Sequence, residues 1–253
     1  MPRPKKFPDH FSAGATEYAR WRPDYPDRLF DYLAGLAPAR RRAWDCATGS
    51  GQAAVTLARH FREVIATDAS ERQISHARRH PRVLYRVAAA ERSGIEAGSI
   101  DLVTVAQALH WFDRPRFWRE ARRVLVPGGM IAIWCYDLLH VSEEVDAVVH
   151  HLYRDIVGPY WPPERSLVER GYGKLEFPFA EQTVPIFWME RRWSLDDLVG
   201  YLGTWSAARR FAEARGENPV ERVREDLASA WGPFGRLRRV RWKLEPRVGR
   251  RIS

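Results

Sequence analysis

Two aspartates, each at the end of an apolar run, are the residues of this chain best placed to do chemistry. Asp45 ends the first run and is followed by a turn that contains Gly49 and Gly51, and Asp68 ends the next run. A strand, a glycine turn, a helix and a second strand with a terminal carboxylate form a βαβ unit, whose second carboxylate meets ribose hydroxyls. The spacing therefore predicts a nucleoside site at these two strand ends.

The kind of nucleoside depends on Asp45. The spacing Gly49-x-Gly51-x-x-Ala54 formally satisfies the dinucleotide fingerprint, so a nicotinamide or flavin enzyme is a competing prediction. However, a carboxylate at the end of the first strand repels an anionic pyrophosphate and attracts a cationic α-amino group. S-adenosylmethionine carries this ammonium group and no phosphate. The residues therefore favour S-adenosylmethionine as the cofactor.

A purely structural role for the same aspartates is the alternative. Asp45 and Asp68 could cap the helices that are predicted to begin near Gln52 and Glu71. A later turn, Pro127-Gly128-Gly129, leads into a further apolar run. Because the carboxylates, the glycine turn and this later turn occur together, ligand binding is favoured over capping.

These residues must be positioned by a regular alternation of strands and helices. The apolar patterns predict strands at 42–45, 64–67, 83–87, 100–106 and 130–136, and helices at 28–36, 52–61, 71–79 and 115–126. This alternation predicts a parallel sheet. The run Ile100–Ala106 is nearly continuously apolar, which is typical of a central strand covered on both faces.

The second half of the chain breaks this rhythm. One helix is predicted at 143–157, and strands at 186–193 and 239–244 flank helices at 196–206 and 220–231. Tyr153, Tyr160, Trp161 and Tyr172 are candidates for an aromatic lid or for the core of an insertion. We therefore expect a covering segment at 1–40, a cofactor-binding core at 41–136, a substrate or lid insertion at 137–184, and a C-terminal completion of the sheet at 185–253.

Composition limits the class of protein. A chain of 253 residues with two cysteines and no pairing pattern fits one catalytic unit in a reducing cytoplasm, without a disulfide framework. No stretch approaches the about 18 apolar residues of a membrane span, so we expect a soluble protein. His76 and His80 have helical spacing but no third ligand, so we expect no metal. The net charge of +9 is spread along the chain without a groove-reading motif, which argues against nucleic acid as a partner.

The motifs resemble a known family. Asp45-x-x-Thr48-Gly49-x-Gly51, Asp68, Ala90-Glu91, Gln107–Phe112 and Pro127-Gly128-Gly129 occur in the order and spacing of the class I S-adenosylmethionine-dependent methyltransferases. Tyr18-x-x-x-Arg22-Pro23-x-Tyr25-Pro26, together with Leu109-His110-Trp111-Phe112, resembles the branch that includes trans-aconitate methyltransferase. The core resemblance covers about residues 11 to 136. It implies an α/β fold with a seven-stranded Rossmann-like sheet, helices on both faces, an antiparallel last strand and a small lid insertion.

The resemblance assigns cofactor contacts at the first two strand ends. Asp45 would lie near the methionyl ammonium group, Gly49 and Gly51 would let the backbone approach the ligand, and Asp68 would accept both ribose hydroxyls. Ala47 stands where the family usually has its first glycine, which is tolerable if its φ is negative.

The remaining cofactor contacts are implied in the same way. Ala69 and Gln73 would border the adenine, and Ala90 and Glu91 would meet its exocyclic edge. Ala89 stands where many members have an aspartate, so Glu91 is the expected replacement for that acceptor.

The resemblance also assigns the methionine end of the ligand. Gln107 and Ala108 would line the methionine moiety, and Tyr18 or Arg22 would reach its carboxylate. His110 lies where the transferred methyl group would emerge, as a general base or as a wall residue. A carboxylate acceptor, which the trans-aconitate branch suggests, is already ionised at neutral pH and requires no base.

We therefore expect a cytoplasmic enzyme, a monomer or homodimer, that transfers a methyl group by in-line displacement to a small-molecule acceptor, with a carboxylate as the candidate. Catalysis would come mainly from orientation and exclusion of water. Two alternatives stay open at this point: a nucleic-acid methyltransferase, and a non-catalytic domain that binds S-adenosylmethionine.

Overall fold

The computed structural model describes residue 21 and residues 23–252. Its main sheet has seven strands in the order β3-β2-β1-β4-β5-β10-β7. These strands are β1 (Arg42–Cys46), β2 (Glu63–Asp68), β3 (Val83–Val87), β4 (Ile100–Ala106), β5 (Leu125–Trp134), β7 (Ala180–Gln182) and β10 (Arg247–Arg250). Strands β1 to β5 are parallel, and β10 is antiparallel to both of its neighbours. The predicted seven-stranded sheet with an antiparallel last strand is confirmed.

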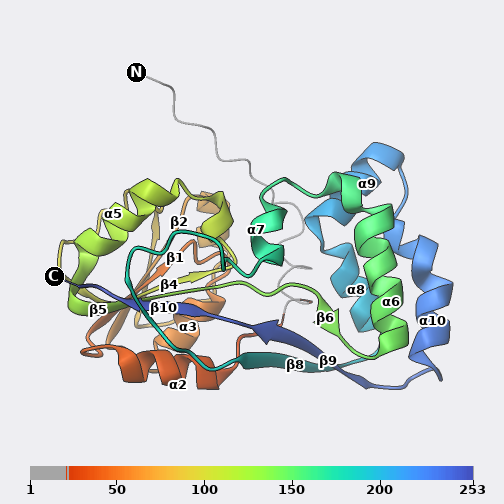
Figure 1. Ribbon diagram of the computed structural model, residues 1–253, viewed down its shortest axis with the longest axis horizontal. Coiled ribbons are helices and arrows are strands. Elements are labelled where there is room, and N and C mark those ends of the chain that lie inside the picture. Colours follow the sequence, from red (N-terminus) through yellow and green to blue (C-terminus); the bar gives the residue numbers. More distant parts are fainter. Residues whose placement is uncertain (1–20, 22, 253) are drawn as a thin grey trace.

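Helices cover both faces of this sheet (Figure 1). They are α2 (Asp27–Leu36), α3 (Gln52–Leu57), α4 (Glu71–Ser75) and α5 (Arg114–Val124). Leu29 and Phe30 of α2 pack with α3 in one buried cluster, whereas Phe117 of α5 lies in a second cluster on the opposite face. Both faces of β4 are therefore buried, as its continuous apolar run predicts.

Two predicted helices are shorter in the structure. The helix predicted at 52–61 ends at Leu57, and the helix predicted at 71–79 ends at Ser75. The Ser75 hydroxyl donates to the carbonyl oxygen of Arg72, which competes with continuation of the helix. The first turn of each helix, which follows a predicted site residue, forms as expected.

A second layer lies beyond one end of the main sheet. It contains α6 (Glu143–His151) with a π-helical continuation (Leu152–Ile156), α8 (Leu195–Gly203), α9 (Ser206–Arg215) and α10 (Arg224–Trp231). Short helical segments complete the chain: η1 (Leu109–Trp111), η3 (Gly158–Tyr160), α7 (Arg165–Glu169) and η4 (Pro219–Val223). Helix α8 begins with a capping box between Ser194 and Asp197. We call α6, α8, α9 and α10 the helical layer.

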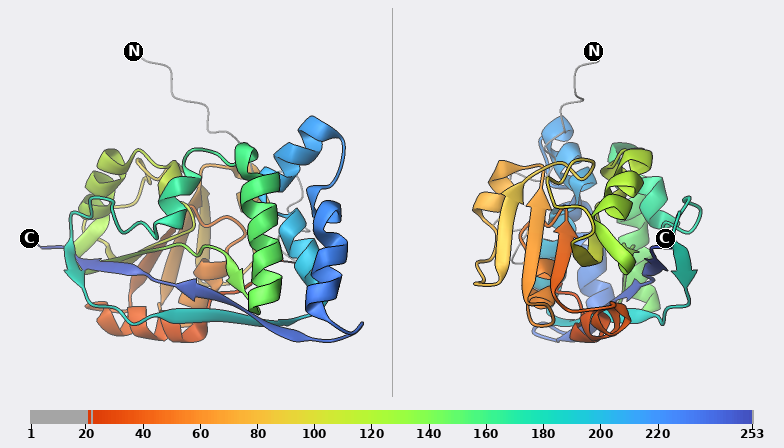
Figure 2. Two further views of the ribbon diagram at one scale, coloured as in Figure 1. Left: turned by 45° about the vertical axis from the view of Figure 1, so that its right-hand side comes forward. Right: turned by 90° about the vertical axis from the view of Figure 1, so that its left-hand side faces the viewer.

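The C-terminal strands require a correction. The strands predicted at 186–193 and 239–244 form as β8 (Phe187–Trp193) and β9 (Arg238–Leu244), but they do not complete the main sheet. They pair with β6 (Leu139–His140) in a separate three-stranded sheet, whose ribbon connects the main sheet to the helical layer (Figure 2). Alternate residues of β9 are buried, namely Val240, Trp242 and Leu244, and the residues between them are more exposed. This alternation is typical of an antiparallel sheet with one solvent-exposed face.

The predicted segments 137–184 and 185–253 each contribute to more than one layer, and β10 of the second one joins the main sheet. The segment 137–184 supplies β6 to the small sheet, α6 to the helical layer and β7 to the main sheet. Strand β10 fits between β5 and β7 because position 249 is a glycine. A side chain there would place its Cβ only 2.6 Å from the Cβ of Phe179. Within the described residues, no helix is long and apolar enough to cross a membrane.

Candidate functional site

The turn after β1 is built by two glycines in the left-handed conformation. Gly49 has φ +53° and Gly51 has φ +79°. A side chain at position 51 is also excluded by space, because its Cβ would lie 2.3 Å from the Tyr85 hydroxyl oxygen. The Thr48 amide donates to the Thr67 carbonyl oxygen at 2.9 Å, which ties the turn to the end of β2. The turn therefore lies directly beside Asp68.

Ala47 does not have the negative φ that would make an alanine easily tolerated at this position. Its φ is +55°, in the left-handed region that favours glycine. Among the residues that the structure describes, Gln107 (φ +56°) and Tyr172 (φ +60°) are the other non-glycine residues with positive φ. Each costs about 1–2 kcal/mol. Gln107 follows β4 and Tyr172 contacts His110, so this strain is concentrated around the predicted site.

Asp45 lies beneath the turn and is only 1% exposed. Its Oδ2 accepts a hydrogen bond from the Thr48 hydroxyl at 2.5 Å, and its Oδ1 accepts one from the Thr104 hydroxyl at 2.8 Å. Burial raises the pKa of Asp45 to about 6, although the two hydroxyls oppose this rise. The structure thus holds a nearly desolvated carboxylate under the turn, where a cationic ligand would stabilise its charged form.

Asp68 ends β2 and is 9% exposed. Its Oδ2 accepts from the Gly49 amide at 2.9 Å, and its Oδ1 accepts from the Ser70 amide at 2.9 Å. A carboxylate at the end of the second strand, beside the glycine turn, is the type of acceptor that ribose hydroxyls require. The turn and Asp68 therefore fit the nucleoside that the sequence predicts.

The residues predicted to surround the adenine lie along the next two connections. Gln73 is on α4. A Cβ built at Gly49 would lie 4.0 Å from the side-chain Oε1 of Gln73, so this side chain lies over the turn. The Ala88 amide donates to the Asp68 carbonyl oxygen and brings the chain at Ala90 and Glu91 to the end of β2. The Oε1 of Glu91 accepts from the Asp113 amide at 2.9 Å, so one of its oxygens also positions the start of α5.

Two further predicted residues, Ala69 and Ala108, occupy different environments. Ala69 is exposed just after β2, whereas Ala108 is 8% exposed and packs in the cluster under α5. Tyr18 and Arg22 lie outside the described residues, so their predicted contacts with the methionine carboxylate stay predictions.

Gln107 is held tightly at the end of β4. Its amide donates to the Trp134 carbonyl oxygen at 2.9 Å, and its Nε2 donates to the Tyr136 carbonyl oxygen at 2.9 Å. These bonds from β5 and the residues after it sustain its left-handed backbone. Gln107 also lines a cavity that opens beyond the strand end.

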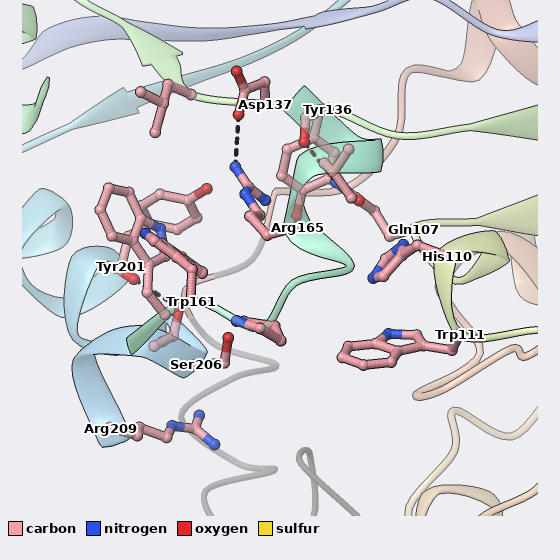
Figure 3. Close-up of a pocket in the computed structure, with 15 residues that line it drawn as sticks. Gln107, His110, Trp111, Tyr136, Asp137, Trp161, Arg165, Tyr201, Ser206 and Arg209 are labelled. Atoms are coloured by element: carbon pink, nitrogen blue, oxygen red, sulfur yellow. Dashed lines mark hydrogen bonds and ion pairs between the residues drawn. The ribbon is translucent and has the colours of Figure 1, made fainter. Parts of the chain in front are cut away.

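This cavity, of about 100 Å³, lies between the end of β4 and the helical layer. His110 and Trp111 form one side, and Trp161, Tyr201 and Arg209 form the other (Figure 3). The remaining lining residues are Gln107, Tyr136, Asp137, Leu138, Pro162, Arg165, Val168, Thr204, Trp205 and Ser206. Aromatic walls with a few polar groups are typical of a small-molecule site. We call it the acceptor cavity.

His110 lies on η1 with its ring directed into the acceptor cavity (Figure 3). Its Nδ1 is 2.8 Å from the hydroxyl oxygen of Tyr172. Burial, assisted by the nearby Arg165 guanidinium, lowers the pKa of His110 to about 3. The imidazole is therefore neutral at physiological pH and is a weak base.

Arg165 is the cation nearest the middle of the acceptor cavity (Figure 3), and its side chain is 18% exposed. Its Nη2 is 2.6 Å from Asp137 Oδ1, and its Nε donates to the Tyr153 hydroxyl oxygen at 2.7 Å. The guanidinium stacks over Trp161 at 4.9 Å from the ring centroid. Fixed from three sides, it can hold an anionic group without further ordering.

The predicted aromatic lid is only partly brought together. Trp161 lines the acceptor cavity, and Tyr153 lies behind it, against Arg165. Tyr160 packs instead against Phe211 of α9, and Tyr172 is buried under His110.

Sequence reasoning missed Arg165, because a single arginine in an irregular segment carries no local signal. It also missed Thr104, whose place opposite Asp45 depends on β-strand register.

The histidines that were weighed as metal ligands do not form a cluster in the described part of the chain. His76 bonds to the Arg72 carbonyl oxygen instead of facing His80. Throughout the described part of the chain, no group of three or more histidine, cysteine or acidic side chains could hold a metal ion.

Comparisons with known proteins agree with this geometry. A family model described as a methyltransferase domain matches residues 44–133, which include both aspartates and the glycine turn. A Dictyostelium discoideum protein named as a methyltransferase is 36% identical over 235 residues, which cover 91% of this chain and 89% of that protein. A solved structure described as a type II methyltransferase from Anaeromyxobacter dehalogenans is 47% identical, with a TM-score of 0.87, and covers 92% of this chain and 99% of its own.

A more distant solved structure extends the fold comparison alone. A Haemonchus contortus phosphoethanolamine N-methyltransferase, solved with S-adenosylhomocysteine, is 16% identical, with a TM-score of 0.51, and covers 100% of this chain and 62% of its own. The strand order, the carboxylates at two strand ends, the family match and the 36% identical relative lead to one conclusion. The chain belongs to the class I S-adenosylmethionine-dependent methyltransferases, and S-adenosylmethionine is its cofactor.

Proposed function

We propose that this enzyme transfers a methyl group to a carboxylate oxygen of a small anionic molecule bound in the acceptor cavity. The observation that carries the proposal is that one small cavity contains both a half-buried arginine, Arg165, and a neutral histidine, His110. Arg165 attracts an anion, and His110 is too weak a base to activate a hydroxyl or amine. A carboxylate needs no such base, because it is ionised at neutral pH.

The charges around the acceptor cavity support an anionic acceptor. Among its described lining residues, Arg165 and Arg209 are cations and Asp137 is the one carboxylate. The Arg165 side chain, at 18% exposure, is shielded from solvent more than that of its partner Asp137, at 45%. Between the walls formed by Trp111 and Trp161, this shielded cation attracts an anion more strongly than it would in water.

The volume supports a small acceptor. About 100 Å³ between aromatic walls suits a compact metabolite better than an extended polymer. Bound S-adenosylmethionine supplies an electrophilic methyl group on a sulfonium sulfur. A carboxylate oxygen forms the new bond to the methyl carbon while the carbon–sulfur bond breaks, and the electron pair remains on sulfur.

The residues of this chain contribute positioning to that displacement. Asp68 and the glycine turn would hold the nucleoside, Asp45 would favour the ammonium group, and Arg165 would orient the acceptor. Aromatic walls would exclude water and hold the reacting atoms at a near-attack separation of about 3–3.5 Å, which can supply much of the rate. No proton has to be removed from the acceptor.

The chemical stability of the product tests the proposal. Small-molecule extracts and total RNA would each be incubated with the enzyme and S-adenosylmethionine that carries a tritiated methyl group. Methyl esters release volatile methanol in mild alkali, whereas N-methyl and ether products do not. We expect alkali-labile label in the small-molecule fraction. Alkali-stable label alone, or label in RNA alone, would overturn the proposal.

A further inference from the structure

Tyr172 combines burial with backbone strain beside the acceptor cavity. It is 1% exposed, has φ +60° and directly follows Gly171, which has φ +57°. The Tyr172 amide donates to the Leu167 carbonyl oxygen, and its own carbonyl oxygen accepts from Arg247 at 2.8 Å. Surrounding structure therefore imposes a conformation that a non-glycine residue rarely adopts. Such strain persists only when the surroundings impose it, and it clusters at active sites and ligand-binding regions.

The phenol of Tyr172 has a single hydrogen, and its neighbours decide where that hydrogen points. Burial raises the pKa of the phenol well above its usual range, so the hydroxyl stays protonated. Among the described residues, the side-chain partner of this hydroxyl is Nδ1 of His110, at 2.8 Å.

The tautomer of His110 follows from this hydrogen bond to Tyr172. A buried phenol hydrogen needs an acceptor, and His110 Nδ1 is 2.8 Å from the phenol oxygen, so this hydrogen is the one that joins the oxygen to Nδ1. Nδ1 is then an acceptor, and the neutral ring carries its hydrogen on Nε2. The ring projects into the acceptor cavity, on the side opposite Trp161 (Figure 3).

Building on the proposed carboxylate acceptor, we infer that Tyr172 is a positioning residue that fixes His110 as an Nε2–H donor to that acceptor. One carboxylate oxygen accepts from Nε2–H and the anion is attracted by Arg165, which leaves the other oxygen for the methyl group. His110 thus selects for an anionic oxygen and does not remove a proton. An ammonium group in place of the acceptor carboxylate would meet the Nε2–H donor and the Arg165 guanidinium, and would be rejected.

Nitrogen-15 NMR of histidine-labelled, full-length protein without acceptor tests the tautomer directly. We expect the His110 Nδ1 shift of an unprotonated nitrogen, unchanged from pH 5 to pH 9. In Tyr172→Phe, the Nδ1 shift should move toward that of a protonated nitrogen, because the donor that fixed the tautomer is gone. The matched control, Tyr160→Phe, removes a hydroxyl that accepts from Arg215 instead of contacting His110, and it should leave the shift unchanged.

Kinetics test the donor role with a second set of variants. His110→Leu removes the donor and should lower kcat/KM for the acceptor by about 10- to 100-fold, as for a hydrogen bond to a charged group. His110→Gln places an amide N–H near the position of Nε2 and should recover part of this loss. Affinity for S-adenosylmethionine should be the same in both variants.

Three results would overturn the inference: a protonated Nδ1 in the unaltered protein, a glutamine variant no better than the leucine variant, or an acid limb near pH 6–7 in kcat/KM that disappears in His110→Leu. The NMR measurement needs no acceptor. A failure of the carboxylate proposal, seen as alkali-stable product, is therefore distinguishable from a failure of the tautomer assignment.

Discussion

Replacing Asp45 by asparagine should make the protein more stable at neutral pH and should lower its affinity for the cofactor. The substitution keeps the shape of the side chain between Thr48 and Thr104 and removes one buried negative charge. Burial raises the pKa of Asp45 from 3.8 in the unfolded chain to about 6 in the folded protein. The charged form is therefore disfavoured by folding.

The sign and size of the stability effect follow from this rise. A folded-state pKa above the unfolded one gives stability that is present below pH 3.8 and is lost as the pH rises through about 6. The full loss is about 3 kcal/mol at pH 8. An asparagine side chain has no such titration, so the stability of Asp45→Asn relative to the unaltered protein should rise by about 2.4 kcal/mol between pH 4 and pH 8. Imperfect amide hydrogen bonds would offset about 1 kcal/mol at every pH.

Urea unfolding followed by tryptophan fluorescence at several pH values would measure this difference. Asp101→Asn is the matched control, because Asp101 is also buried but accepts from the Arg41 guanidinium and from the Arg41 and Arg42 amides. That control should be destabilised at pH 7. A stability difference between Asp45→Asn and the parent that does not change with pH would refute the reasoning.

Calorimetry adds the opposite effect on the cofactor. In the unaltered protein, affinity for S-adenosylmethionine should fall below about pH 6 as Asp45 becomes protonated, because an ammonium ligand favours the carboxylate. The asparagine variant should bind about tenfold or more weakly at pH 8 and lose this pH dependence. Full affinity in the variant would show that Asp45 does not act on the ammonium group.

Ala47→Gly should stabilise the fold by about 1 kcal/mol, because φ +55° suits glycine; a lower melting temperature would contradict this reading. Asp68→Ala should reduce S-adenosylmethionine affinity at least about tenfold in calorimetry, since it also frees the Gly49 and Ser70 amides, and unchanged affinity would remove Asp68 from the site. The double change Arg165→Met with Asp137→Asn removes both charges of the pair, so that no unpaired carboxylate is left at the acceptor cavity. It should raise the acceptor KM about tenfold or more, with cofactor affinity unaltered; an unchanged KM would argue against an anionic acceptor.

The cofactor-binding half of the fold could be predicted because its signals are local. Strand β1 and Asp45 are followed within a few residues by Gly49 and Gly51, and β2 with Asp68 comes one short helix later. Carboxyl ends of parallel strands meet at one edge of a sheet, so strand type and order were enough to bring these residues together. Even here, local pattern did not reveal the positive φ of Ala47, which depends on how the turn is tied to β2.

The C-terminal half could not be predicted in the same way. The alternating pattern of β8 and β9 predicted strands correctly, but pattern alone does not say which sheet a strand joins. Strand β10 is only four residues long, and its place beside β5 depends on the space that Gly249 leaves for Phe177 and Phe179.

By itself, the sequence determined the alternating elements, the glycine turn and the two carboxylates that predict a methylating cofactor, because each is encoded over a few neighbouring residues. Only the tertiary structure decided the acceptor cavity. His110 meets Tyr172 across 62 positions of the chain, and Asp137 meets Arg165 across 28. Contacts between residues so far apart depend on the packing of the whole molecule, and this packing sets the position of Arg165, the neutrality of His110 and the direction of its N–H.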